Sequence, residues 1–375
     1  MNRRELTGML GGAALLGVLR PPPAAGAAAG DALAVGDAAH SLYARALVLD
    51  CNSSPPIPER LPLSQADLDL VRGSGIDVIK LTLGGIKDDF AQTVASIAQV
   101  QQLLELHPDY FTAVRVAADM PRAQRERKLG IILSFESAEM LGGQVASLEV
   151  FRDLGVRVMQ LSYNRTSPFA AGVMEPNAGG LTALGREAVR EMNRLGIAVD
   201  LSHANPATTI EVLALSSRPP VMTHAGCAAV HAHPRNKTDE QLRALAAKGG
   251  VVGIYDLPYL SGSPHQPTVD DYMAHLLHAL GVVGEDHVGI GSDVGIQPFD
   301  TSAAGMKEFS REVAERRAAG LSAPEEDRPT YVVGLNVPRR MEIIADRLLK
   351  SGHSSVVAEK VLGANFARVF TEIWA

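Results

Sequence analysis

The sequence predicts an α/β protein in which residues 31–375 form a single (β/α)8 TIM barrel. Eight short runs rich in branched aliphatic residues recur along the chain, and helix-length segments separate them. Near-continuous apolar strands that alternate with helices indicate a parallel sheet covered on both faces, and eight such units suit a closed barrel. An open doubly wound sheet is the alternative, but no glycine-rich phosphate-binding turn follows the first run. The runs are ALVLDCN (46–52), IDVIKLTL (76–83), GIILSFE (130–136), VRVMQLSYN (156–164), IAVDLSH (197–203), PVMTH (220–224), VVGIYD (251–256) and HVGIGSD (287–293).

Bulk composition agrees with one large domain and argues against nucleic-acid binding. The chain has 375 residues, of which 46% are hydrophobic, so it can bury a core of barrel size. Its net charge is −7, and no basic run appears beyond the N-terminus. Nucleic acid is therefore not an expected partner.

Residues 1–30 have the pattern of an export signal. Arg3 and Arg4 precede the apolar stretch MLGGAALLGVL, and a tail rich in Pro, Ala and Gly follows. The paired arginines favour the twin-arginine route, with a Sec signal as the alternative. The apolar stretch is too short for a transmembrane helix, so we expect a periplasmic or secreted protein with no membrane span in its mature chain.

The segment between the fifth and sixth runs is predicted to be a helix. Asn205 is a good N-cap, and Pro206 occupies the first helical position. The spacing predicts one buried face made of Thr209, Ile210, Leu213 and Ala214.

Other helices show their own start and stop signals. In LTALGREAVREMNRL (181–195), Gly196 ends the predicted helix. Thr238 to Gln241 reads as a capping box that opens another helix. Two connections are long, 165–180 and 294–335, and we expect loops there that shape a pocket or an oligomer contact. The expected buried face of the 181–195 helix consists of Leu184, Ala188, Met192 and Leu195.

Four strands end in a side chain that can bind a metal ion or move a proton: Glu136, His203, His224 and Asp293. Each alone has an ordinary structural explanation, such as a carboxylate bonded to loop amides. In a β/α barrel, however, all four converge on one mouth. Two imidazoles and a carboxylate suit zinc, with a fourth position open for water. The combination predicts a metal site at the mouth of the barrel.

Several blocks of sequence, in order, resemble the membrane (renal) dipeptidase family of zinc metallopeptidases. They are FESAEML, GGLTALGREAVREMNRLGIAVDLSH, THAGCAAVHAHPRN, DEQLRALAAKGGVVG and DHVGIGSD, and the resemblance extends with gaps from about residue 46 to the C-terminus.

The resemblance implies a β/α barrel with a two-zinc site. By matching positions, Glu136 would bridge the metals, while His203 and His224 would hold the second zinc. Arg235 would bind the terminal carboxylate of the substrate, for which a planar guanidinium is better suited than a lysine. Asp293 would act in proton transfer. The resemblance also implies that the protein can form a homodimer.

The sequence departs from the family pattern at two places. The His-x-Asp pair expected after the first strand, which holds the first zinc, is replaced by Asn52 and Ser54. Neither is a normal zinc ligand, so we expect one tightly bound zinc and a second site that is absent or weak. A further histidine expected after the fourth strand is replaced by Tyr163, which either donates a hydrogen bond to an oxyanion or lines the pocket.

Other candidate ligands are assigned to supporting positions. His231 and His233 lie in a connection after the sixth strand, so we interpret them as loop residues outside the metal site. Strand alternation predicts that Cys51 points away from the bore if Asn52 points into it. A disulfide between Cys51 and Cys227 is conceivable, but two free thiols are the safer interpretation.

The prediction that combines these observations is an exported zinc hydrolase that cleaves the amide bond of dipeptides or related small acyl-amino acids. Glu136 and Asp293 are the catalytic residues, Arg235 and Tyr163 contact substrate, and Glu136, His203 and His224 hold zinc. Two alternatives are an amidohydrolase with one metal that acts on other substrates, and a catalytically weakened homologue that binds a small ligand.

Overall fold

The computed structural model describes residues 34–56, 61–84 and 88–375. The predicted export signal at residues 1–30 lies outside the described residues. Within these ranges, no helix has both the length and the apolar composition needed to cross a bilayer.

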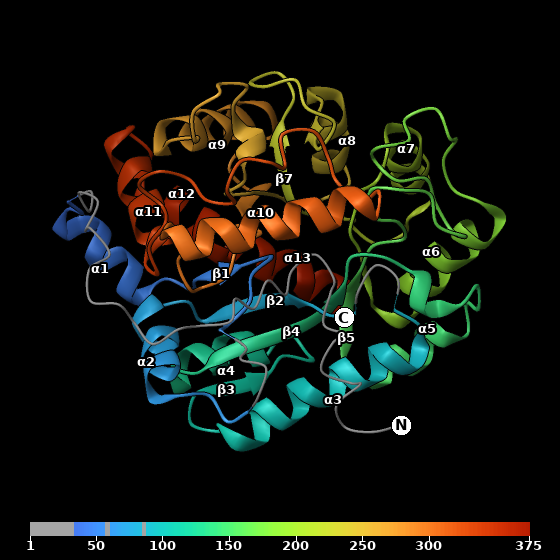
Figure 1. Ribbon diagram of the computed structural model, residues 1–375, viewed down its shortest axis with the longest axis horizontal. Helices are drawn as coiled ribbons and strands as arrows, with labels where there is room; N and C mark the ends of the chain where they lie inside the picture. Colours follow the sequence, from blue (N-terminus) through green and yellow to red (C-terminus); the bar gives the residue numbers. More distant parts are fainter. Residues whose placement is uncertain (1–33, 57–60, 85–87) are drawn as a thin grey trace.

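Eight parallel strands of the described residues form a closed barrel in the order β1-β2-β4-β5-β6-β7-β9-β10 (Figure 1). Two connections join the sheets that the ladders alone leave separate. Asp200 pairs in parallel with Val221, which links β6 to β7. The amide of Cys51 donates to the carbonyl of Ile290 at 2.9 Å, which links β1 to β10 and closes the ring. The strands are β1 (Leu49–Asp50), β2 (Val78–Thr82), β4 (Leu129–Phe135), β5 (Val156–Met159), β6 (Ala198–Val199), β7 (Met222–Cys227), β9 (Val252–Ile254) and β10 (Val288–Ile290).

Each of the eight predicted runs overlaps one of these strands, so the barrel prediction is confirmed. The two short strands β3 (Phe111–Ala113) and β8 (Asn236–Lys237) are additional; they pair with β4 and β7. Helices follow the barrel strands and cover the sheet from outside (Figure 1). They are α1 (Asp37–Arg45), α2 (Gln65–Ser74), α3 (Phe90–Leu106), α4 (Asp119–Glu126), α5 (Ser147–Asp153), α6 (Ala183–Leu195), α7 (Pro206–Leu215), α8 (Asp239–Ala247), α9 (Val269–Val283), α10 (Ala303–Ala318), α11 (Arg340–Lys350), α12 (Ser355–Glu359) and α13 (Asn365–Trp374).

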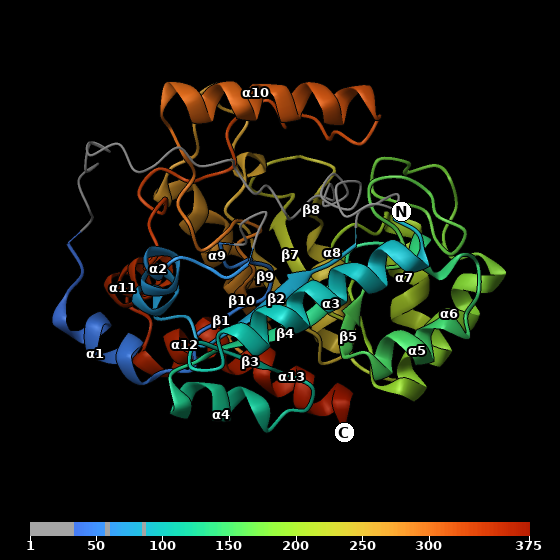
Figure 2. The same cartoon turned by 60° about the horizontal axis from the view of Figure 1, so that its bottom comes forward.

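The buried apolar side chains form two clusters. The larger cluster fills the layer between the sheet and the surrounding helices. The smaller one takes residues from alternate positions of the strands together with apolar residues of α13, which lies with α4 at the amino end of the barrel (Figure 2). It consists of Leu49, Cys51, Val78, Ile132, Val158, Ala198, Val221, Val251 and residues packed on them from α4, from α13 and from Val114 after β3.

Cys51 therefore lies inside the barrel, and the prediction that it points away from the bore is wrong. Regular strand geometry ends at Asp50, and a bend at Cys51–Asn52 lets both neighbouring side chains face inward. Strict alternation holds only while the chain stays pleated. Both cysteines are free, in agreement with the preferred interpretation, and both are buried.

The predicted helix boundaries around the site are confirmed, although the buried faces are only partly correct. Asn205 caps α7 by accepting a hydrogen bond from the Thr208 amide, and Gly196 ends α6 in the left-handed conformation. The α7 face is rotated from the prediction: Thr209 and Leu213 are buried with Thr208 and Val212, whereas Ile210 is 60% exposed and Ala214 is also exposed. In α6, Ala188 and Met192 are buried, but Leu184 is exposed and Leu195 is only half-buried.

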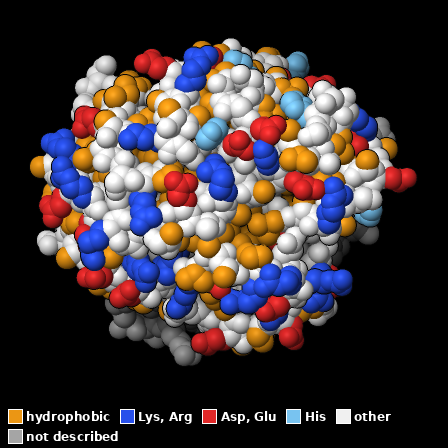
Figure 3. All heavy atoms as spheres, turned by 180° about the vertical axis from the view of Figure 1, so that it is seen from behind, with side chains coloured by type: hydrophobic (Ala, Val, Ile, Leu, Met, Phe, Trp, Pro, Cys, Tyr) orange, Lys and Arg blue, Asp and Glu red, His pale blue; other side chains and the backbone are white. Residues whose placement is uncertain are grey.

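The long connection 294–335 is not a plain loop, because it contains the 16-residue helix α10. Figure 2 shows α10 lying across the carboxyl ends of the strands, on the side of the barrel opposite α13. Viewed from behind, the molecule carries basic, acidic and hydrophobic side chains intermixed over its surface (Figure 3).

Candidate metal centre

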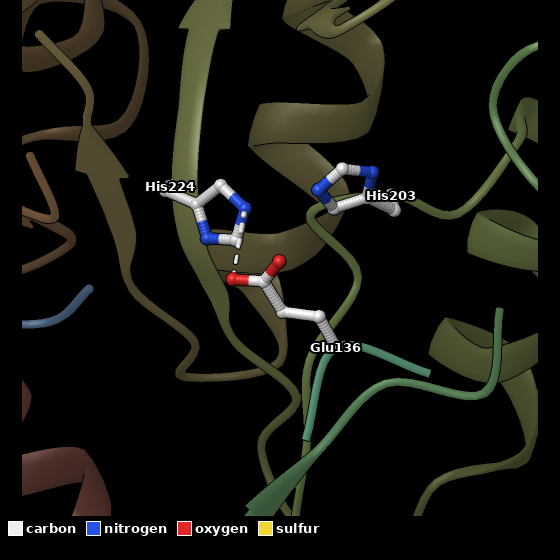
Figure 4. A group of neighbouring side chains, drawn as sticks. All are labelled: Glu136, His203 and His224. Carbon is white, nitrogen blue, oxygen red and sulfur yellow. Dashed lines mark ion pairs between the residues drawn. The ribbon is translucent and has the colours of Figure 1, made fainter. Parts of the chain in front are cut away.

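Three of the predicted strand-end residues meet in one buried cluster at the mouth of the barrel. The ligand atoms of Glu136, His203 and His224 all lie within 4.8 Å of one another (Figure 4). Glu136 follows β4, His203 follows β6 and His224 lies on β7, so sheet closure brings together residues up to 88 positions apart. His224 Nε2 is 3.9 Å from Glu136 Oε1 and 4.0 Å from Oδ2 of Asp293, the fourth predicted residue.

Hydrogen bonds fix the orientation and tautomer of His203. Its Nδ1 lies 2.9 Å from Oδ1 of Asn164, whose own amide nitrogen donates to the carbonyl of Leu321. The Asn164 oxygen must therefore accept, which places the His203 proton on Nδ1. The Nε2 lone pair is then left for a metal ion.

His224 is oriented in the same way by a hydroxyl relay. The Thr223 hydroxyl donates its only proton to Asp200 Oδ2 at 2.5 Å. Its oxygen can then only accept from His224 Nδ1, which lies 2.9 Å away. His224 Nε2 is buried and has no hydrogen-bond partner among the described residues. A buried nitrogen lone pair that faces a carboxylate is an arrangement that a metal ion would satisfy.

The electrostatic environment keeps both imidazoles neutral. Burial, with a smaller contribution from the cation Arg235, lowers the pKa of His203 and of His224 well below the ordinary value. Neutral imidazole is the form that binds a metal ion. The donor set of two imidazoles and one carboxylate therefore fits a zinc-like ion.

Donors from β2 and from the residues after β1 converge on the Glu136 oxygen that faces His224. Asn52 Nδ2 donates to Glu136 Oε1 at 2.8 Å, and the Thr82 hydroxyl lies 3.0 Å from the same oxygen. Lys80 Nζ is 4.0 Å from it and is fully buried. Sequence reasoning missed Lys80 and Thr82, although a lone lysine inside the apolar run IDVIKLTL was the available signal.

Asp293 forms two hydrogen bonds with Asn52, which follows β1. Its amide donates to the Asn52 carbonyl at 2.8 Å, and its Oδ1 accepts from Asn52 Nδ2 at 2.6 Å. Its backbone adopts the left-handed conformation with φ 58°. Burial, together with the neighbouring Glu136 carboxylate, raises the pKa of Asp293 well above its ordinary value. Asp293 therefore binds a proton more readily than an ordinary aspartate does.

Arg235 is a buried cation that offers free donors. It is 2% exposed, and its Nε and Nη2 have no hydrogen-bond partner among the described residues. Its guanidinium carbon lies 5.9 Å from the ring centres of Tyr255 and of Tyr259. Two unpaired N–H groups of one guanidinium match the two oxygens of a carboxylate.

Tyr163 packs on the metal cluster and is held from above by α10. Its ring stacks on His203 with centroids 4.0 Å apart, and its hydroxyl accepts from Arg316 Nη2 at 3.3 Å. Burial raises the pKa of Tyr163 to about 12, so the phenol is un-ionised. Arg316 is in turn paired with Glu326 at 2.8 Å. The predicted position beside the site is thus observed, and the partner of the hydroxyl comes from the segment that was expected to be a loop.

The remaining candidates lie around this centre. His231 and His233 lie in the loop before β8. His233 accepts a hydrogen bond from the Arg235 amide at 3.2 Å, and His231 lies 3.3 Å from Glu325. Ser54 contributes its carbonyl to the Ile296 amide. It has no hydrogen bond to the metal cluster among the described residues.

Comparison with known proteins places this geometry in a family. The family model "Membrane dipeptidase (Peptidase family M19)" matches residues 64–317. A dipeptidase of Claviceps purpurea, tcpJ, is 30% identical over 291 residues, which are 77% of this chain and 60% of that protein. The match thus spans less than two thirds of the length of that relative.

Solved structures share the fold over nearly their whole length. An amidohydrolase from Pseudomonas aeruginosa is 30% identical with a TM-score of 0.78, covering 90% of this chain and 99% of that one. A metallo peptidase from Rhodobacter sphaeroides, liganded with a phosphinate mimic of the dipeptide L-Ala-D-Ala, has a TM-score of 0.71 at 21% identity, covering 87% and 99%. The chain belongs to the membrane dipeptidase family, peptidase family M19.

Proposed function

We propose that this protein is a zinc-dependent hydrolase that cleaves the amide bond of dipeptides or related small acyl-amino acids. The single observation that carries the proposal is the paired orientation of the two imidazoles. Both turn their protonated Nδ1 toward fixed acceptors, so both Nε2 atoms are available beside Glu136. Glu136, His203 and His224 would hold the ion.

Bound there, the ion would supply a Lewis acid and a water whose pKa is lowered to about 7. The residues of the chain supply the proton transfers and the binding. Water adds to the carbonyl carbon of the substrate, and Asp293 takes up the proton that the water releases. Asp293 then delivers a proton to the amide nitrogen as the carbon–nitrogen bond breaks. Because its pKa is raised above the ordinary value, the carboxylate of Asp293 accepts a proton more readily, which suits this exchange.

Arg235 would bind the carboxylate at the C-terminal end of the substrate. Its Nε and Nη2 are buried and have no partner among the described residues. A bound carboxylate would accept a charge-assisted hydrogen bond from each of them and so replace the water that Arg235 lost on burial. A substrate of this kind needs a free carboxylate close to its scissile bond. A dipeptide or an acyl-amino acid meets that requirement.

The test compares a dipeptide with the same dipeptide amidated at its C-terminus. The wild type should hydrolyse the free acid about 30-fold faster or more in kcat/KM, since truncating a buried charge pair costs about 2–5 kcal/mol. Arg235→Met should lose activity on the acid and no longer discriminate between the two. Equal rates for acid and amide in the wild type would contradict the role of Arg235.

A second candidate keeps the site and changes the substrate. Its support is the 30% identity with the Pseudomonas amidohydrolase and the Asn52 amide in contact with Glu136 and Asp293. An enzyme with one ion stabilises less charge in the transition state, which favours substrates with a better leaving group. A panel of acyl-amino acids assayed beside dipeptides separates the two candidates, and binding without turnover of either class would instead indicate a small-ligand-binding homologue.

We also propose that the protein is exported by the twin-arginine route and acts in the periplasm or outside the cell. The support is the pair Arg3–Arg4 before a weakly apolar stretch. Replacing both arginines by lysine should leave a folded precursor in the cytoplasm. Unchanged export of that variant would indicate a Sec signal instead.

A further inference from the structure

The two halves of the site differ in chemistry. On the side of β6 and β7, the imidazoles of His203 and His224 offer lone pairs. On the side of β1 and β2, the described residues Asn52, Thr82 and Lys80 present hydrogen-bond or ion-pair donors to Glu136. An amide nitrogen that donates to two carboxylates cannot at the same time be a metal ligand.

The orientation of the Asn52 amide follows from its surroundings. Its nitrogen lies 2.8 Å from Glu136 Oε1 and 2.6 Å from Asp293 Oδ1. The opposite assignment would place the amide oxygen against two carboxylates, which is repulsive. Its actual oxygen lies 3.3 Å from the Thr82 hydroxyl. The half of the site on the side of β1 and β2 therefore does not fit a metal ion.

Lys80 supplies a positive charge in that same half. Its Nζ donates to Thr82 Oγ1 at 3.1 Å and to Ser134 Oγ at 3.3 Å, and it forms a 4.0 Å ion pair with Glu136. The residue is 0% exposed. A buried ammonium is costly unless a carboxylate compensates it, and Glu136 lies within ion-pair distance.

We propose that Lys80 and Asn52 together take the place of a first metal ion, so that the protein has a mononuclear site with a built-in cation. Lys80 neutralises Glu136 at Oε1, the oxygen that also lies 3.9 Å from His224 Nε2. Asn52 donates hydrogen bonds to both Glu136 and Asp293. These bonds hold the two carboxylates near each other, as a cation shared between them would. Lys80 is thus a positioning residue that acts through Glu136. The inference deepens the proposed function but is tested by counting bound ions, which requires no turnover.

The experiment is a two-by-two set of variants. Asn52→Asp replaces the donor by an acceptor of the same shape, and Lys80→Met removes the charge while keeping the length of the side chain. The hydroxyls of Thr82 and Ser134, which accept from Lys80 in the wild type, can still form a hydrogen bond with each other, since Thr82 Oγ1 and Ser134 Oγ lie 3.3 Å apart. Each protein is saturated with zinc, passed over a desalting column and analysed for metal per folded chain.

The wild type and both single variants should retain one ion, because either the ammonium or the amide still excludes a second. The double variant should retain two, because three carboxylates then face a space without a cation. A second ion retained by Asn52→Asp alone, or only one ion in the double variant, would overturn the proposal. Lys237→Met is the matched control: Lys237 is also a buried lysine near the mouth, but its Nζ donates to the Ala204 carbonyl. Combined with Asn52→Asp, it should leave the count at one.

A measurement on the unmodified protein covers the case in which Lys80→Met fails to fold. Loaded with excess Mn²⁺ and desalted, the wild type should give the electron paramagnetic resonance spectrum of an isolated ion. An exchange-coupled spectrum would show two neighbouring ions and contradict the proposal. If these results hold and no dipeptide is cleaved, the proposed function fails while the account of Lys80 stands.

Discussion

The metal-binding side chains depend on neighbouring groups that decide which ring nitrogen carries the proton. His203 is set by Asn164, and His224 is set by Thr223 and Asp200. Such groups fix the tautomer and the ring orientation of the ligands, and their mutation commonly weakens metal binding. Their effect on metal affinity can be measured separately from any effect on turnover.

Thr223 gives the sharpest test at this scale. Thr223→Val keeps the shape of the side chain but removes the acceptor for His224 Nδ1, so zinc affinity should fall about 10- to 100-fold. Thr223→Ser keeps the hydroxyl and should bind zinc nearly as tightly as the wild type. Competition with a chromophoric chelator measures both. Equal affinities of the valine and serine variants would show that the relay does not set the tautomer.

The residues that strand-end reasoning identified are those with a distinctive chemistry at the end of an apolar run. Glu136, His203, His224 and Asp293 fall into this class and lie together in the structure. Asn52 was recognised only as a departure, and its contacts with two carboxylates depend on how β1 meets β10. Lys80 could not be assigned, because only the register between β2 and β4 shows that it reaches Glu136.

His275 of helix α9 forms a hydrogen bond to the barrel strand β7. His275 Nδ1 accepts from the Cys227 amide at 2.8 Å, and its Nε2 donates to the Leu260 carbonyl at 2.9 Å. Both ring nitrogens are occupied in the neutral form, since protonated Nδ1 could no longer accept. Burial lowers the pKa of His275 to about 4.

This depressed pKa predicts a loss of stability in acid. In the unfolded chain the imidazole protonates near its ordinary value of about 6.5, whereas in the folded protein it stays neutral to about pH 4. The unfolded state therefore binds more protons in this window, and His275 should cost up to about 3 kcal/mol as the pH falls from 6.5 to 4. The thermal midpoint of the wild type should fall more steeply than that of His275→Gln. Parallel pH profiles, or an NMR titration of His275 near pH 6.5, would contradict this prediction.

The strands were predictable from sequence, because a buried parallel strand is a short, nearly continuous apolar run. The faces of α7 and the nature of the segment 294–335 were not. Ile210 is exposed although it is apolar, because α7 packs through Thr208, Thr209, Val212 and Leu213 instead. The charged sequence of α10 has no marked apolar face, and its position over the mouth depends on polar contacts such as Arg316 with Tyr163.

For the whole molecule, metal binding should be linked to folding. The three ligands lie at or after the ends of β4, β6 and β7, and only the folded sheet brings these strand ends together. An ion that binds only the folded state at 100 times its Kd adds about 2.7 kcal/mol. A chelator should therefore lower the thermal midpoint by a few degrees. His203→Ala should show no such shift, and an equal shift in that variant would place the stabilising ion elsewhere.

The central claim is that the barrel mouth holds a single tightly bound ion, with Asn52 and Lys80 in the place of another. Elemental analysis of the unmodified protein tests it most directly, after incubation with excess zinc and removal of weakly bound ions by gel filtration. The account predicts one zinc per chain. Two zinc ions per chain that survive the column would contradict it.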